Sequence, residues 1–329
     1  MTKEIKAYDT NPWTEKETRK HKAIAHTQLM DRLYSSQIDV CAVNTEIYSN
    51  LLTVKYRGCN PDMKISLLDA DTVSAARNNA DGKTAVLNFA SYKNPGGMFI
   101  EGSIAQEEAL CHESFLYNVL GQKVEYYAWN NQHKNRALYT NRALYSPNVI
   151  FTKEDGTEDF KCDVITCAAP NYTTAKKYLH VSEKGNEDIL ASRCKYILDI
   201  AENNNVDTLI LGAWGSGVFG QDAGTVASIF SNLLNTGTYG FSNVIFAVPK
   251  GKNGNYDKMD TVAARECWDD SIVTSSVMAN IVVLMYDNLR EQIHEEYAPC
   301  SNMRFLKEYC KKDPSFEDIL CKEFSITLQ

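Results

Sequence analysis

The chain has 329 residues, a formal net charge of −8, 44% hydrophobic residues and 23% charged residues. These values suit one large globular domain, or one domain with additions, and argue against non-specific binding to a bare nucleic-acid backbone. The first residues, MTKEIKAYDTNPW, lack the apolar core of a signal peptide, and the apolar run near VMANIVVLMY is too short to span a bilayer. We therefore expect a soluble intracellular protein with no membrane partner, either cytoplasmic or nuclear, and no sequence-specific contact with nucleic acid.

Ten cysteines are scattered along the chain, without a Cys-x-x-Cys pair or a nearby histidine pair at zinc-binding spacing. Cys111 and His112 are adjacent, which is poor geometry for two ligands of one metal ion. We predict reduced thiols that are mostly buried, no metal site and no cofactor.

Helices and strands are expected to alternate along most of the chain. A charged helix should begin after Asn11-Pro12, and a second should run from an N-cap near Asp71 to a stop at Gly82. The apolar run KTAVLNFA, at residues 83–90, predicts a buried strand. The elements expected after it are a helix over 106–120 that ends at Gly121, strands over 148–153 and 161–171, a helix over 186–206, a strand over 207–211, a helix over 223–237 and a strand over 241–251.

This alternation predicts an α/β fold with right-handed crossovers and a mixed, mainly parallel sheet. Two of the strands run directly into glycine-rich loops. Because ligands bind at the carboxyl ends of strands in open α/β sheets, both loops should lie on one rim. The residues after about 256 are polar with helical character, typical of an extension that packs on the core.

The second glycine loop (residues 212–220) has the sequence GAWGSGVFG and stands between a strand and a helix. Gly212, Gly215, Gly217 and Gly220 would let the backbone approach an anion at the helix N-terminus, which predicts a phosphate cradle. A tight strand–helix turn is the alternative. The loop matches neither a Walker A motif nor G-x-G-x-x-G. Its aromatic residues could belong to the core or stack on a sugar or base.

The first glycine loop (residues 91–105) and the residues after it have the sequence SYKNPGGMFIEGSIAQEE. Ser103 and Gln106 have the spacing of a capping box, which would place Glu107 and Glu108 in or just after the first helical turn. Acidic residues there can simply favour the helix dipole.

The two glutamates also allow a catalytic interpretation. Neighbours on a helix are about 100° apart, so the carboxylates should face different directions. One could hold ligand hydroxyls while the other protonates the leaving oxygen of a glycosidic bond. A general acid needs a raised pKa, which the helix N-terminus opposes and burial would have to supply.

The stretch LNFASYKNPGGMFIEGSIAQEEALCHES resembles the signature of poly(ADP-ribose) glycohydrolases. The order FA…NPGG…QEE, then CAAPN, GAWGSGVFG and VIFAV is similar to the microbial type, over roughly residues 60–250. The resemblance implies a macrodomain-like, three-layer α/β/α fold that binds ADP-ribose. It also implies hydrolysis of the ribose–ribose O-glycosidic bond without a metal ion.

The resemblance implies roles for individual residues. Glu108 would be the catalytic acid, Glu107 would hold ribose hydroxyls, and Gln106 would support that turn. Phe219 would pack on the ribose to be released. The other positions implied to contact the ligand are Asn88, Ala90, Asn94, Gly96 and Gly97 at the first loop, and Gly215, Ser216, Gly217, Val218 and Gly220 at the second.

One residue departs from the family pattern of three consecutive glycines, since Met98 occupies the third position. Its side chain should crowd the ligand, although backbone N–H contacts can survive. A hydrolase of mono-ADP-ribose on protein or nucleic acid therefore stays open, as does a non-catalytic ADP-ribose reader, which the intact Gln-Glu-Glu disfavours. A nucleotide-dependent dehydrogenase lacks its fingerprint.

We predict three parts: an N-terminal helical extension over 1–60, a macrodomain-like catalytic core over 61–255, and a C-terminal helical extension over 256–329 packed on the core. The expected partner is ADP-ribose or poly(ADP-ribose) attached to proteins, and the expected state is a monomer.

Overall fold

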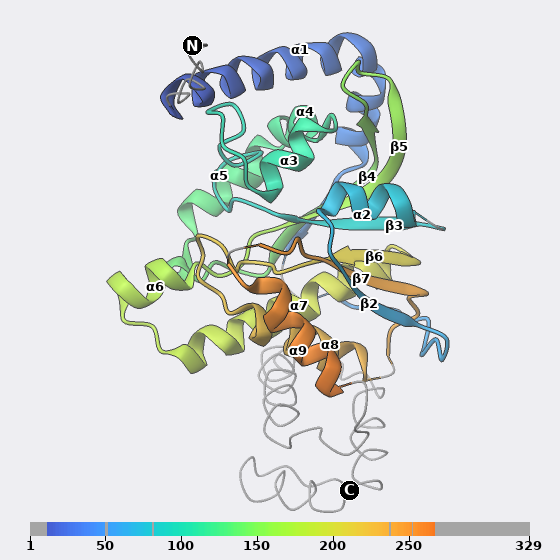
Figure 1. Ribbon diagram of the computed structural model, residues 1–329, viewed down its shortest axis with the longest axis vertical. Helices are drawn as coiled ribbons and strands as arrows, with labels where there is room; N and C mark the ends of the chain where they lie inside the picture. The colour runs from blue at the N-terminus through green and yellow to red at the C-terminus, as the bar shows by residue number, and fades with distance from the viewer. Residues whose placement is uncertain (1–11, 50–51, 81, 237, 252, 267–329) are drawn as a thin grey trace, which may run out of the picture. The chain divides into compact units, whose positions relative to one another are not determined.

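The computed structural model describes residues 12–49, 52–80, 82–236, 238–251 and 253–266 (Figure 1). Most of the predicted C-terminal extension lies outside these residues. The helices are α1 (Pro12–Asn44), α2 (Thr72–Asn79), α3 (Gln106–His112), α4 (Leu116–Gly121), α5 (Val124–Gln132), the 3-10 helix η1 (Asn135–Ala137), α6 (Tyr172–Leu179), α7 (Glu183–Asn203), α8 (Ala223–Leu234) and α9 (Asn255–Glu266).

The strands form one seven-stranded sheet in the order β1-β4-β5-β3-β6-β7-β2. Their bounds are β1 (Glu46–Ser49), β2 (Lys64–Leu68), β3 (Thr84–Phe89), β4 (Arg142–Thr152), β5 (Glu158–Cys167), β6 (Thr208–Leu211) and β7 (Asn243–Ala247). The pairs β5–β3, β3–β6, β6–β7 and β7–β2 are parallel, whereas β1–β4 and β4–β5 are antiparallel. The predicted mixed, mainly parallel sheet is confirmed.

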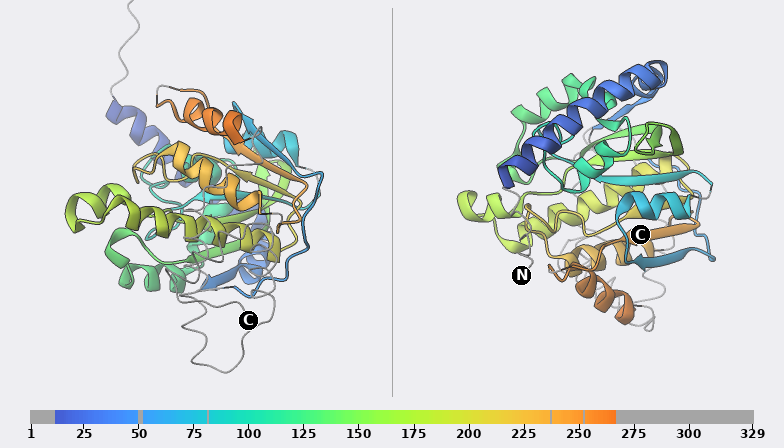
Figure 2. Two further views of the ribbon diagram at one scale, coloured as in Figure 1. Left: turned by 90° about the horizontal axis from the view of Figure 1, so that it is seen from below. Right: turned by 45° about the horizontal axis from the view of Figure 1, so that its top comes forward.

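Helices cover both faces of this sheet (Figures 1 and 2). One face shares a core with α1, α2, α3 and α4, where residues such as Met30, Leu110 and Phe115 are fully buried. On the other face α7 contacts β5 and packs against α8. Since β3 and β6 are buried along nearly their whole length, their sequences are mostly apolar.

Side-chain caps fix where several helices begin. Asp71 accepts the N–H of Ser74 at the start of α2, as predicted, and Asp222 accepts the N–H of Thr225 at the start of α8. The predicted stop at Gly82 is wrong, because α2 already ends at Asn79.

The single helix predicted over 106–120 is also wrong, because two short helices, α3 and α4, replace it. Between them Ser114 forms an isolated bridge with Phe151 of β4. The Ser114 hydroxyl donates to the carbonyl of Leu110 at 2.6 Å and accepts the N–H of Leu116 at 3.1 Å. These bonds give the chain an alternative to a continuous helix at this point.

The division into extensions and core stays a prediction. Within the proposed N-terminal extension, however, β1 is the edge strand of the sheet and α1 packs on α4 and β4. Five of the six described cysteines are buried and all six are free, as predicted. None of the helices within the described ranges is both long and apolar enough to cross a membrane.

Candidate active site

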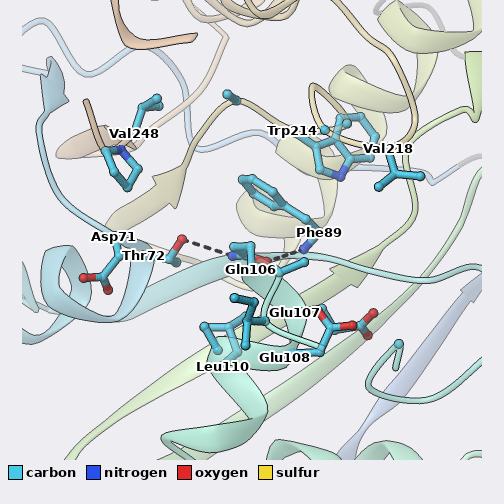
Figure 3. Close-up of a pocket in the computed structure, with 18 of the residues that line it drawn as sticks. Asp71, Thr72, Phe89, Gln106, Glu107, Glu108, Leu110, Trp214, Val218 and Val248 are labelled. Atoms are coloured by element: carbon cyan, nitrogen blue, oxygen red, sulfur yellow. Dashed lines mark hydrogen bonds between the residues drawn. The ribbon is translucent and has the colours of Figure 1, made fainter. Parts of the chain in front are cut away.

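A cavity of about 960 Å³ opens where β3, β6 and β7 end (Figure 3). Both glycine loops line it, together with α3 and the residues that follow β7. The prediction that the two loops share one rim is confirmed. It follows from topology, since β3 and β6 are parallel neighbours whose carboxyl ends meet at the same edge.

Gln106 fastens the start of α3 to the sheet. Its Oε1 accepts the N–H of Phe89 at 2.8 Å, and its Nε2 donates to the carbonyl of Leu87 at 2.9 Å and to Oγ1 of Thr72 at 3.1 Å. Figure 3 shows Gln106 directed toward Thr72 and Phe89. The predicted capping box is wrong, because the N-cap is Ala105 and has no side-chain cap. Gln106 instead fixes α3 against β3.

Glu107 is buried, and two donors hold its carboxyl group. The N–H of Ser91 donates to Oε2 at 2.7 Å, and the Asn88 amide donates to Oε1 at 3.3 Å. Burial raises the pKa of Glu107 to about 8, helped by the charge of Glu108 and opposed by these hydrogen bonds. Glu107 therefore keeps its proton in much of the free protein at neutral pH.

Glu108 is also buried, and it is held by the first glycine loop. The N–H of Met98 donates to Oε1 of Glu108 at 2.9 Å. Gly97 has a φ of +61°, and a Cβ there would lie 2.6 Å from Oε1 of Glu108 and 2.9 Å from Oε2 of Glu107. Both carboxylates therefore approach the same glycine. The expectation that the two carboxylates face different directions is wrong, because both glutamate side chains are long enough to bend toward Gly97.

Met98 fits this loop without strain. It does not belong to the residues with positive φ, so its backbone angles suit an L side chain. The residue is 48% exposed and lines the cavity. The predicted crowding of the ligand stays a prediction, while the backbone N–H of Met98 contacts Glu108.

The second glycine loop needs glycine at three positions. A Cβ on Gly212 would lie 2.7 Å from the carbonyl oxygen of Ala247. Gly215 and Gly220 have φ of +76° and +71°. A Cβ on Gly215 would lie 2.7 Å from Cβ of Ala169. Gly217 has open space around it, and the neighbouring Val218 is 85% exposed. The loop thus turns tightly at its ends and presents its middle to the cavity.

Two stacked tyrosines support the ring of Phe219. Its ring centroid lies 6.1 Å from that of Tyr139, edge to face, and Tyr139 stacks on Tyr92 at 4.1 Å. The segment that carries Tyr139 is anchored by Arg193, which is 1% exposed and donates to the carbonyls of Leu138 at 2.9 Å and Ala168 at 3.1 Å. These contacts fix one wall of the cavity.

The cavity brings most of the predicted site residues together. Those that line it are Glu107, Glu108, Gln106, Ala90, Gly97, Gly215, Gly217, Val218 and Phe219. The predicted residues behind or beside the lining are Asn88, Asn94, Gly96, Ser216 and Gly220. Asn88 is fully buried beneath Glu107, and Gly96 packs against Tyr117, where a Cβ would lie 2.6 Å from the ring.

Sequence reasoning missed the far end of the cavity. Lys250, Asn253 and Asn255 line it after β7, and Thr72 lines it from α2. Only their position along the chain could have indicated these residues, since they follow or face strand ends at the rim that the two glycine loops share.

Stability should fall with rising pH because of Glu107. The folded protein holds this proton up to about pH 8, whereas the unfolded chain releases it near the ordinary pKa of 4.5. The folded state therefore binds more protons between these values, and stability declines as pH rises through that window. In Glu107→Gln the part of the decline that Glu107 causes should disappear. The unfolding free energy of the variant, relative to that of wild type, should therefore rise by roughly 3 to 5 kcal/mol between pH 4 and pH 9.

Urea unfolding at several pH values measures this effect. Oδ1 of Asn88 has no hydrogen-bond partner within the described structure, so it can accept an N–H from the amide that Glu107→Gln introduces once the Asn88 side chain rotates. The exposed Glu101→Gln is the matched control and should follow the wild-type curve. Parallel curves for wild type and Glu107→Gln would contradict the prediction.

Comparison with known proteins places this geometry in context. The family model for the microbial-type PARG catalytic domain matches residues 16–154. A second model, for the anti-CRISPR protein AcrIC5, matches residues 271–312, which lie outside the described residues. No curated protein matches the chain.

Solved structures match over most of the chain. Poly(ADP-ribose) glycohydrolase from Thermomonospora curvata is 27% identical, with 76% of this chain and 99% of that chain covered and a TM-score of 0.65. The same enzyme bound to the inhibitor ADP-HPD is 27% identical, with 74% and 99% covered and a TM-score of 0.64. A variant of the Deinococcus radiodurans enzyme in complex with ADP-ribose is 30% identical, with 70% and 98% covered and a TM-score of 0.62.

Proposed function

Because this chain belongs to the microbial-type poly(ADP-ribose) glycohydrolase family, we propose that it hydrolyses the ribose–ribose O-glycosidic bonds of poly(ADP-ribose) and releases ADP-ribose. The observation that carries the proposal is the convergence of two buried carboxyl groups on Gly97 inside a cavity that the second glycine loop also lines. Binding alone does not require such a pair.

In the proposed mechanism Glu108 protonates the oxygen that leaves with the rest of the polymer. The C–O bond breaks through an oxocarbenium-like transition state, and a water molecule adds to the ribose carbon. The Glu108 carboxylate accepts the proton that this water gives up, which restores the acid. The N–H of Met98 keeps Glu108 in place, since it holds Oε1 at 2.9 Å.

Glu107 has a different part in the proposal. Its Oε2 is held by Ser91 and its Oε1 by Asn88, so the group is rigid enough to orient ribose hydroxyls. With a pKa of about 8 it is largely protonated at neutral pH. Asn88 is a positioning residue, because it acts through Glu107 and lies behind the cavity wall.

The second glycine loop supports binding of a diphosphate. Gly217 leaves the backbone open to a ligand, and Oγ of Ser216 is buried without a hydrogen-bond partner in the described structure. Phe219 provides the wall against which the ribose would pack. No described group of three or more His, Cys, Asp or Glu side chains could hold a metal ion, and the expectation of a metal-free reaction stays a prediction.

A turnover assay on purified poly(ADP-ribose), without added metal, tests the proposed function. Release of free ADP-ribose supports it. Calorimetric binding of ADP-ribose without release of ADP-ribose from the polymer would replace it with a reader or a hydrolase of another linkage.

Met98 motivates a second candidate, a hydrolase of single ADP-ribose units. This half-exposed residue lines the cavity where the family pattern has glycine. Comparing the rates of release from polymer, singly modified protein and singly modified DNA separates the two candidates. The polymer should be the preferred substrate.

Tyr139→Ala should weaken catalysis without touching the carboxylates. Removal of this ring takes away the brace behind Phe219 and leaves a cavity beside Tyr92, so stability should fall by about 3 kcal/mol. The kcat/KM for polymer should fall about tenfold, the effect of about 1.4 kcal/mol of reduced positioning. Tyr139→Phe keeps the stacked ring and should stay near wild type. Equal kcat/KM for Tyr139→Ala and wild type would show that Phe219 needs no brace.

A further inference from the structure

A group of basic side chains lies beside the cavity in an otherwise acidic protein. We name the residues 134–137 and 172–184 the basic lobe, which consists of η1, α6 and the start of α7. Its exposed basic residues are Lys134, Arg136, Lys176, Lys177 and Lys184. None of them forms an ion pair with any described residue, although the chain as a whole has a net charge of −8. Acidic residues do occur in the lobe, at Glu183, and just beyond it, at Glu187 and Asp188, but they leave these cations unpaired.

Hydrogen bonds make the basic lobe one unit. The N–H of Asn171, the N-cap of α6, donates to the carbonyl of Ala137 at 2.9 Å. The Arg136 guanidinium donates to the carbonyl of Leu179. Figure 2 shows α6 at the outer end of α7, beyond the strands. Lys176 and Lys177 of α6 are both exposed.

The basic lobe is continuous with the wall of the cavity. The N–H of Thr173 donates to the carbonyl of Phe219 at 3.1 Å, and a Cβ on Gly220 would collide with Oγ1 of Thr173. In the proposed function Phe219 borders the ribose whose bond is cut. A polymer that continues beyond that ribose leaves the cavity at this wall.

Two aromatic rings accompany the cations. Nζ of Lys176 lies 5.3 Å from the ring centroid of Tyr172, and Nζ of Lys177 lies 4.9 Å from that of Tyr178. The Tyr178 side chain is 63% exposed. Tyr172 is of intermediate exposure. Rings next to cations suit a ligand that alternates bases with phosphates, because rings stack on bases and cations bind the phosphates.

We propose that the basic lobe binds the neighbouring unit of the poly(ADP-ribose) chain whose terminal unit occupies the cavity. This inference rests on the proposed function. The neighbouring unit offers two phosphates to the lysines and one adenine ring to the tyrosines. Poly(ADP-ribose) is favoured over nucleic acid as the ligand of the basic lobe, because the lobe adjoins the cavity wall beside the reacting ribose.

The test is the double variant Lys176→Gln/Lys177→Gln, with Lys64→Gln/Lys153→Gln as the control. The control lysines are also exposed and outside every described ion pair, and they lie on β2 and after β4. We expect kcat/KM for long polymer to fall about tenfold in the test variant at low salt. The negative slope of log K against log salt should become less steep by about 1.4, near 0.7 for each phosphate that a lysine no longer neutralises. The Kd for ADP-ribose should not change, and the control should match wild type throughout.

Binding measurements separate this inference from the proposed function. Polarisation of labelled poly(ADP-ribose) is measured with every variant in a Glu108→Gln background, so that turnover does not consume the polymer and the Kd is independent of activity. An unchanged polymer Kd in the test variant overturns the inference even if wild type is active. A weaker polymer Kd supports it even if wild type releases no ADP-ribose, in which case only the proposed function fails.

A second variant and a second polyanion complete the test. Lys134→Gln/Lys184→Gln should weaken polymer binding in the same way if the first variant proves unstable. Single-stranded DNA of matched charge should bind more weakly than the polymer. Tighter binding of DNA, abolished in the same variants, would assign the lobe to nucleic acid instead.

Discussion

Glu108→Gln should lose the release of ADP-ribose from poly(ADP-ribose), by roughly 10²- to 10⁴-fold, and still bind ADP-ribose. Glutamine has the same shape and can accept the N–H of Met98 that holds Oε1 of Glu108 at 2.9 Å. It cannot deliver a proton to the leaving oxygen. The rate of ADP-ribose release and the calorimetric Kd for ADP-ribose, measured on one preparation, check both halves of the prediction.

The control for this variant lies on the first glycine loop, shortly before α3. Glu101→Gln makes the same chemical change at a half-exposed carboxylate, which forms only a surface ion pair of 3.5 Å with Lys20. Such pairs contribute little, so activity should stay near wild type. If Glu108→Gln keeps full turnover, another group is the acid. Glu107, with its pKa of about 8, would then be the first to examine.

Gly97→Ala should damage the site by adding a single methyl group. Its Cβ would lie 2.6 Å from Oε1 of Glu108 and 2.9 Å from Oε2 of Glu107, so at least one carboxylate must move. The φ of +61° adds a cost of about 1 to 2 kcal/mol for any residue with a Cβ. We expect turnover to fall by roughly a hundredfold or more, since displacement of about 1 Å at a reacting group has that effect.

Thermal or urea unfolding and initial rates measure this result. Gly121→Ala is the matched control, because nothing lies within 4 Å of its added Cβ and its φ is not positive. It should unfold at the same or a slightly higher denaturant concentration and keep full activity. Wild-type turnover in Gly97→Ala would show that the carboxylates tolerate displacement and that their convergence on Gly97 does not matter for catalysis.

Local patterns of sequence predicted the central part of the fold and the site. The strand KTAVLNFA and the two glycine loops are recognisable from apolar runs and turn residues, and parallel topology then brings the loops together. The edge strands β1 and β2 were not predicted because they are short and partly exposed, so they carry no continuous apolar run.

Contacts between distant segments explain what could not be predicted. Gln106 has the spacing of a capping residue, but its partners Thr72 and Phe89 belong to other elements that only the fold brings near. The break between α3 and α4 depends on the bridge from Ser114 to β4. The stack of Tyr92 on Tyr139 likewise joins residues that no local pattern relates.

Met98 has a consequence for inhibitor design. Its backbone N–H donates to Glu108, while the residue is 48% exposed and lines the cavity. A compound that fills the cavity and extends over this side chain gains contact with a flexible, polarisable thioether, which packs well against aromatic groups. Enzymes with glycine at this position offer no such contact. Contact with Met98 would therefore distinguish this protein from enzymes with glycine at that position. A substitution of Met98 would remove the contact with such a compound and still leave a backbone N–H for Glu108.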